Sequence, residues 1–192
     1  HFPGHGETRV DSHAELPVVD HPPERLRAHE MAPLRAAIAA EVATVMTAHV
    51  LYPALDAEQP ATLSRAIIDD ILRRALGHHG LIVTDDLEMG AITGSHTVES
   101  AAVRALCAGC DTLLMCGDSI ARHAAAIEAI IHAVETEEID PRLIDVARAR
   151  QQRVKARFMG GVRPSRPLSG TVLKARLGTT LHQAVAGEIA RA

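Results

Sequence analysis

The sequence predicts an α/β fold in which a parallel sheet is covered by helices. Three short segments, residues 42–47, 81–83 and 112–115, are almost uniformly apolar, as strands buried on both faces are. Stretches with helical periodicity separate them, and polar clusters follow each one, at the edge where α/β proteins build their sites. Three strands cannot close a barrel, so these patterns leave open either part of an eight-stranded barrel or a small open sheet.

Apolar spacing and chain terminators mark the helices. Residues 33–40 open with a proline, which suits a first helical turn. Ser64 is a potential cap for a helix over residues 65–76, whose apolar residues recur at helical spacing until Gly77. The remaining helices are expected over residues 97–108, 119–134, 141–157 and 180–190.

In two stretches the apolar residues recur at neither helical nor strand spacing. Residues 1–29 are rich in His, Pro, Gly and Asp and are expected to form a long loop, a feature that is usually functional or disordered. After Arg157 the chain becomes rich in Gly, Pro and Arg, as linkers are. We therefore expect one structural unit over residues 1–158 and a linker or tail over residues 159–192.

The composition argues against several functional classes. The chain is 47% hydrophobic and 23% charged, which is ordinary for a globular domain with a core. Its formal charge is −4 with mixed signs, so it lacks the basic stripe typical of nucleic-acid binding. No apolar run approaches the roughly 20 residues that a membrane span needs. We expect neither a nucleic-acid partner nor a membrane.

The cysteines favour a reducing compartment. Cys107 and Cys110 form a C-x-x-C, and Cys116 follows in the third strand segment. Their positions suit small buried residues, because a redox or zinc site would need a second Cys/His pair at metal-site spacing. An odd number of cysteines without a disulfide framework leads us to expect a cytoplasmic protein.

Asp85 is the first candidate catalytic residue. It directly follows the strand segment 81–83 and precedes a second carboxylate, Asp86. An Asp here can simply end the strand or cap the next helix. Alternatively, one carboxylate can face a site while hydrogen bonds hold the other. A carboxylate in such a place suits a nucleophile toward an anomeric carbon, or a metal ligand.

Asp11 and His13 form the second candidate pair. A carboxylate that accepts a hydrogen bond from one imidazole nitrogen fixes the tautomer and raises the basicity of the other, which makes a proton shuttle. A plain polar surface loop would have the same spacing. A metal site is a further alternative, with the ligands His1, His5, His13, His21 and Asp85. Because histidines are spread over the whole chain, we expect no metal and no cofactor.

Five strings occur in order along the chain: H-F-P-G-H-G-x-T-x-x-D-S-H, V-M-T-A-H-V-x-Y-P-A-L-D, P-A-T-L-S, G-L-I-V-T-D-D-L-E-M and A-G-C-D-T-L-L-M. Together they resemble glycoside hydrolase family 3, and in particular its β-N-acetylhexosaminidase branch, from residue 1 to about residue 158. The resemblance implies a parallel (β/α)8 barrel, of which only about the last three or four β/α units are present.

The resemblance also implies roles for six residues. Asp85 would be the nucleophile and His13 the general acid/base, which Asp11 would orient. The residues that contact the sugar would be His1, His49 and Met89. The implied reaction is retaining exo-cleavage of terminal β-linked N-acetylglucosamine from glycans or muropeptides in cell-wall recycling. A histidine acid/base does not repel an anionic acceptor, so a phosphorylase is an alternative. The first half of the family's barrel has no counterpart in this sequence. A metal-binding protein or a non-catalytic remnant of the enzyme is therefore a further alternative.

Overall fold

The strands form one parallel sheet, which confirms the predicted fold class. The computed structural model describes residues 1–160 and 167–191. The sheet contains β1 (Thr44–Met46), β2 (Leu81–Asp86) and β3 (Thr112–Leu114), in that order. Val45 of β1 lies opposite Ile82, and Val83 lies opposite Thr112 of β3. β2 extends beyond the predicted residues 81–83, so Asp85 lies within the strand and not after it.

The first residues of the chain occupy a fourth strand position. Phe2 pairs with Thr47 in parallel, just beyond β1. The Phe2 amide donates to the Met46 carbonyl (2.7 Å), and the Ala48 amide donates to the Phe2 carbonyl (2.8 Å). His1 therefore lies at the same edge of the sheet as the residues that follow β1 and β2.

Helices separate the strands in sequence, as predicted. In chain order they are α1 (Pro23–Ala28), α2 (Ala32–Ala39), η1 (Ala61–Leu63), η2 (Ala66–Ala75), α3 (Gly90–Thr93), α4 (Val98–Ala108), α5 (Ile120–Glu135) and α6 (Pro141–Met159). The predicted helix over residues 65–76 is η2, which has the wider i→i+5 hydrogen bonding of a π-helix. Thr97 and Ser119 cap α4 and α5 by accepting backbone N–H bonds.

Besides the three-residue η1, two short α-helices before β3 were not predicted. α1 lies inside the expected loop over residues 1–29 and buries only Leu26. α3 has four residues between β2 and α4. Neither is long enough to display a helical period, which is the signal that the sequence prediction depends on.

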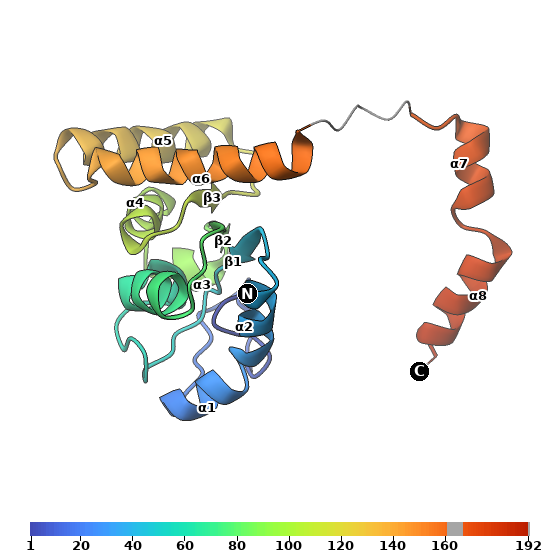
Figure 1. Cartoon of the computed structure of the whole chain (residues 1–192), viewed down its shortest axis with the longest axis horizontal. Helices are drawn as coiled ribbons and strands as arrows, with labels where there is room; N and C mark the ends of the chain where they lie inside the picture. The colour runs from blue at the N-terminus through green and yellow to red at the C-terminus, as the bar shows by residue number, and fades with distance from the viewer. Residues whose placement is uncertain (161–166, 192) are drawn as a thin grey trace. The chain divides into compact units, whose positions relative to one another are not determined.

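The core is built from small and branched aliphatic residues. One cluster lies around the sheet and contacts η2 and α4, and its fully buried members include Ile67, Ile68 and Ile82. A second cluster joins α4, α5 and the start of α6 (Figure 1). Its buried members are Val103, Leu106, Ala133 and Ile139.

The chain divides into two compact units, His1–Phe158 and Met159–Ala192. The second contains α7 (Gly170–Arg176) and α8 (Thr180–Ile189), capped by Ser169 and Thr179. α8 agrees with the helix predicted over residues 180–190, whereas α7 lies in the segment expected to be a linker. Part of that expected linker, residues 161–166, lies outside the described residues. None of the described helices combines the length and the apolar character that crossing a bilayer requires.

Asp111, at the start of β3, links this strand to β2, η2 and α6 through its side chain. Its side chain is 1% exposed and contacts the guanidinium groups of Arg73 from η2 and Arg150 from α6. Its Oδ2 also accepts the amide of Ile82 in β2 (2.8 Å). Arg73 is itself 8% exposed, so its charge depends on Asp111 for compensation.

We expect Asp111→Ala to lower the free energy of unfolding by about 3–5 kcal/mol, because it leaves the buried Arg73 without its counter-ion. Denaturant unfolding followed by circular dichroism measures this loss. The matched control is Arg65→Ala, which removes an ion pair to Asp69 whose arginine is 72% exposed. That loss should stay below about 0.5 kcal/mol. Equal losses in the two variants would contradict the anchoring role.

Candidate active site

Two adjacent carboxylates at the end of β2 point in different directions, because side chains alternate along a strand. Asp86 is held by hydrogen bonds: its Oδ1 accepts the amides of Glu88 (3.1 Å) and Cys116 (3.1 Å). Asp85 receives one internal bond, from the Asp86 amide to its Oδ1 (2.9 Å). Its side chain retains 16% exposure, and its Oδ2 lies 3.1 Å from Nε2 of His1. Asp85 therefore has fewer internal hydrogen bonds than Asp86, and its Oδ2 faces the His1 imidazole.

His49 supports the end of β2 from inside the protein. It is fully buried, and both ring nitrogens are engaged, Nδ1 with the Thr62 hydroxyl (2.8 Å) and Nε2 with the Asp86 carbonyl (2.9 Å). Since a carbonyl only accepts, Nε2 carries the proton, and Nδ1 accepts from Thr62 when the ring is neutral. Burial lowers the pKa of His49, which favours that neutral form.

Asp11 and His13 form the predicted pair on the loop between Phe2 and α1. The His13 Nδ1 donates to Asp11 Oδ1 at 2.8 Å, and the His13 amide donates to the same oxygen at 2.9 Å. The side chains are 71% and 77% exposed. Since Nδ1 is committed to Asp11, Nε2 is the nitrogen that can exchange a proton with a ligand.

The charges around this loop shift both pKa values. The hydrogen bond and charge of Asp11 raise the pKa of His13, and Asp85 and Asp86 add smaller contributions of the same sign. The His13 amide, followed by its ring, lowers the pKa of Asp11. Both shifts favour an ion pair near neutral pH. The loop also lies beside the segment after β2, because the amides of Gly90 and Ala91 donate to the carbonyls of His13 and Ser12 (3.0 Å each).

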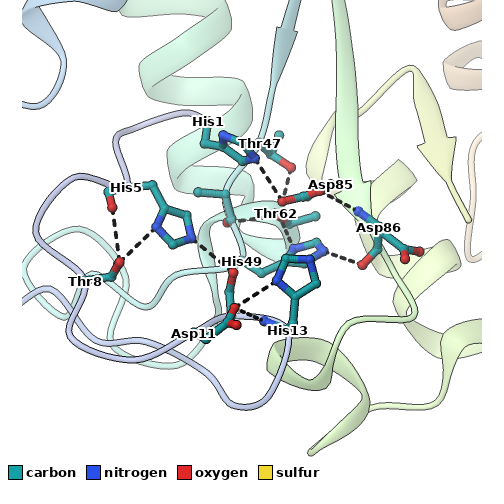
Figure 2. A network of polar contacts seen from close by, with 12 residues as sticks. His1, His5, Thr8, Asp11, His13, Thr47, His49, Thr62, Asp85 and Asp86 are labelled. Atoms are coloured by element: carbon teal, nitrogen blue, oxygen red, sulfur yellow. Dashed lines mark hydrogen bonds and ion pairs between the residues drawn. The ribbon is translucent and has the colours of Figure 1, made fainter. Parts of the chain in front are cut away.

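The structure brings five of the six predicted site residues into one region. Figure 2 shows His1, Asp11, His13, His49 and Asp85 gathered around the end of β2. The sixth, Met89, is 6% exposed and directly precedes α3, outside the polar network drawn there. Its predicted contact with the sugar stays a prediction, as do the roles of the other five.

The sequence prediction missed the residues that order the loop and the strand end. Ser12 is 5% exposed, and its hydroxyl lies 3.2 Å from Nε2 of His5, whose Nδ1 bonds the Thr8 hydroxyl (2.9 Å). Thr62, from η1, bonds His49 and the Thr47 hydroxyl (2.8 Å). His5 was considered only as a metal ligand, and no spacing in the sequence marks the other four.

Three of the five ligands of the alternative metal hypothesis have separate partners: His5 has Thr8 and Ser12, His13 has Asp11, and His21 has Glu7. The other two, His1 and Asp85, contact each other (3.1 Å). Within the described part of the chain, the group with ligand geometry is Glu7, His21 and Glu30. However, the guanidinium of Arg25 contacts Glu7 and lies 3.9 Å from Glu30. A cation there would face a fixed positive charge, so the donor set favours the arginine over a metal.

A family model decides the classification. The model of the glycosyl hydrolase family 3 N terminal domain matches residues 1–154, most of the chain. The chain belongs to glycosyl hydrolase family 3. This confirms the predicted family and assigns the sheet to a (β/α)8 barrel, of which β1–β3 and the strand position of Phe2 are present.

Family 3 relatives cover the chain at substantial identity. A β-hexosaminidase A of Pseudoalteromonas piscicida is 32% identical over the whole chain, which spans 34% of that protein. A β-hexosaminidase of Idiomarina loihiensis is 41% identical over 71% of the chain and 41% of its own length. The solved family 3 β-N-acetylglucosaminidase of a Paenibacillus species is 44% identical, with a TM-score of 0.85 over 88% of this chain and 32% of that one. The chain thus spans about a third of the first relative.

We expect Asp11→Asn to lower the pKa of His13, because it removes the charge and weakens the hydrogen bond that raise it most. A titration of the His13 ring protons by NMR measures the change. The control is Glu15→Gln, which removes a carboxylate from the same loop and should leave the titration unchanged. If both substitutions act equally, the shift is a general loop charge effect and not a property of the pair.

We expect acid to destabilise the protein partly through His49. Its pKa is lowered in the folded state, so below the unfolded value of about 6.5 the unfolded chain takes up the proton more readily. The free energy of unfolding should therefore fall as pH decreases below about 6.5. In His49→Gln, which keeps a donor and an acceptor but does not titrate, the fall should be smaller. Urea unfolding across that range gives the slope, and an unchanged slope in the variant would contradict this account.

Proposed function

We propose that the chain forms the catalytic part of a retaining exo-β-N-acetylglucosaminidase. The observation that carries the proposal is the Asp85 carboxylate at the end of a barrel strand, within electrostatic reach of an imidazole that Asp11 orients. The names of the relatives, β-hexosaminidase and β-N-acetylglucosaminidase, support the same reaction class. Active sites of (β/α)8 enzymes lie at this edge of the barrel.

In the proposed reaction, each step belongs to a particular atom. Asp85 Oδ2 attacks the anomeric carbon and forms a glycosyl-enzyme while His13 Nε2 gives its proton to the leaving oxygen. The neutral imidazole then takes a proton from the water that releases the sugar, and Asp85 leaves as a carboxylate. Asp11 holds the ring through Nδ1 in both steps, which keeps Nε2 as the exchanging nitrogen.

The substrate we propose is a glycan with terminal β-linked N-acetylglucosamine, and more narrowly a muropeptide in peptidoglycan recycling. A cytoplasmic location would suit this role and agrees with the three cysteines, all of which are free thiols. Phosphate is a second possible acceptor. A histidine acid/base is neutral when it accepts the proton, and it does not repel an anion as a carboxylate would.

The test is release of 4-nitrophenol from 4-nitrophenyl N-acetyl-β-D-glucosaminide by this chain. We expect Asp85→Asn to reduce release at least about a thousandfold, because the nucleophile is lost. Asp145→Asn, an exposed change on α6, should leave the rate unaltered. A 5-fluoro glycosyl fluoride of N-acetylglucosamine should add one sugar to the peptide that contains Asp85, as mass spectrometry would show.

Added phosphate separates the two acceptors. Formation of N-acetylglucosamine 1-phosphate at the expense of the free sugar would identify a phosphorylase, whereas free sugar alone supports the hydrolase. If the chain neither releases nitrophenol nor becomes labelled at Asp85, it does not perform this reaction by itself, and the proposal fails for this polypeptide.

A further inference from the structure

The N-terminus of α3 is joined to the loop that carries Asp11 and His13. The first amides of a helix have no partner inside the helix, and no side chain caps α3. Two loop carbonyls take this role. The Gly90 amide donates to the His13 carbonyl (3.0 Å), and the Ala91 amide donates to the Ser12 carbonyl (3.0 Å).

The close approach requires glycine at position 90. A Cβ placed on Gly90 would lie 2.7 Å from the carbonyl oxygen of His13 and closer still to that of Ala14. Both obstacles are backbone atoms, which a side-chain rotation cannot move. Gly6, on the same loop, is different, since a Cβ there would meet no atom within 4 Å.

α3 is in turn fixed to the strand that carries Asp85. The Met89 amide donates to the Asp86 carbonyl (3.1 Å), and the Glu88 amide donates to the Asp86 carboxylate. The contact at Gly90 therefore lies a few bonded residues away from Asp85. The contact at Gly90 thus connects the loop to the end of β2 through backbone atoms only.

The Asp11–His13 pair does not itself depend on this contact. Its hydrogen bonds lie within three consecutive residues, and both side chains are largely exposed. His5, Thr8 and Ser12 order the loop from within. What the contact to α3 adds is the location of the pair relative to Asp85.

We propose that Gly90 is a positioning residue that sets the His13 imidazole against the Asp85 carboxylate, by letting the amides of Gly90 and Ala91 bind the loop carbonyls. The proposal rests on the function proposed above for its catalytic meaning. Its structural content is independent of turnover. Replacing Gly90 should separate the loop from β2 while leaving the Asp11–His13 pair formed.

The test is an NMR titration of the His13 ring in four proteins: the unaltered chain, Asp85→Asn, Gly90→Ala and the double variant. We expect Asp85→Asn to lower the pKa of His13 in the unaltered chain, because a nearby negative charge is removed. In the Gly90→Ala background, the same substitution should have a clearly smaller effect. An equal effect in both backgrounds, or none in the unaltered chain, overturns the proposal.

Two controls separate positioning from general damage. Asp11→Asn should lower the pKa of His13 equally in the unaltered chain and in the Gly90→Ala background, which would show that the loop pair survives. Gly6→Ala should leave the effect of Asp85→Asn unchanged, because it adds the same methyl group in open space. If Gly6→Ala weakens the effect as much as Gly90→Ala does, the specific role of Gly90 is refuted.

A second measurement uses the unaltered chain and does not depend on how any variant folds. Hydrogen exchange at the amides of Gly90 and Ala91 should be slow, although first-turn amides of a helix normally exchange fast. Fast exchange at both would show that the loop does not bind α3, and would overturn the proposal. None of these readouts needs turnover, so an inactive chain would count against the proposed function without deciding the role of Gly90.

Discussion

Asp86 holds the end of β2, and the geometry of the candidate site depends on it. Its carbonyl accepts His49 Nε2 and the Met89 amide, while its carboxylate accepts the amides of Glu88 and Cys116. These bonds fix the strand to the segment before α3 and to the segment after β3. Asp86 is held in this scaffold, and the alternation of side chains along the strand directs the neighbouring Asp85 toward His1 instead.

The sequence predicted elements whose signals are local. The apolar runs located β1, β2 and β3, and potential caps and glycines located the longer helices, because these features act over a few residues. It also identified Asp11, His13 and Asp85 as candidates, and the structure places them around one strand end. The strand position of Phe2 could not be predicted, because its pairing with Thr47 joins residues far apart in the chain. The same holds for the bond from His49 to Asp86, which are 37 residues apart.

Two histidines near Asp85 differ in their properties because their environments differ. His49 is buried, and the loss of solvation lowers its pKa, so it holds the strand as a neutral ring. His13 is exposed and paired with Asp11, which raises its pKa and favours the cation. A proton donor must hold a proton that it can give away, and of these two histidines it is His13 that combines a raised pKa with a ring nitrogen outside its hydrogen bond to Asp11. Types and spacing of residues cannot distinguish these cases, since burial decides between them.

Glycine permits close contacts on both sides of the β2 end. A Cβ on Gly90 would strike the carbonyls of the loop, and a Cβ on Gly117 would lie 2.5 Å from Oε2 of Glu88, which accepts the Gly117 amide. In each case a neighbouring loop contacts the segment after β2 through a backbone amide. The contact at Gly90 joins backbone to backbone, so it fixes position without ordering a flexible side chain, whereas the contact at Gly117 also orders the Glu88 side chain. A site whose groups sit on a strand and on a separate loop needs such contacts, because small displacements between reacting groups reduce a rate steeply.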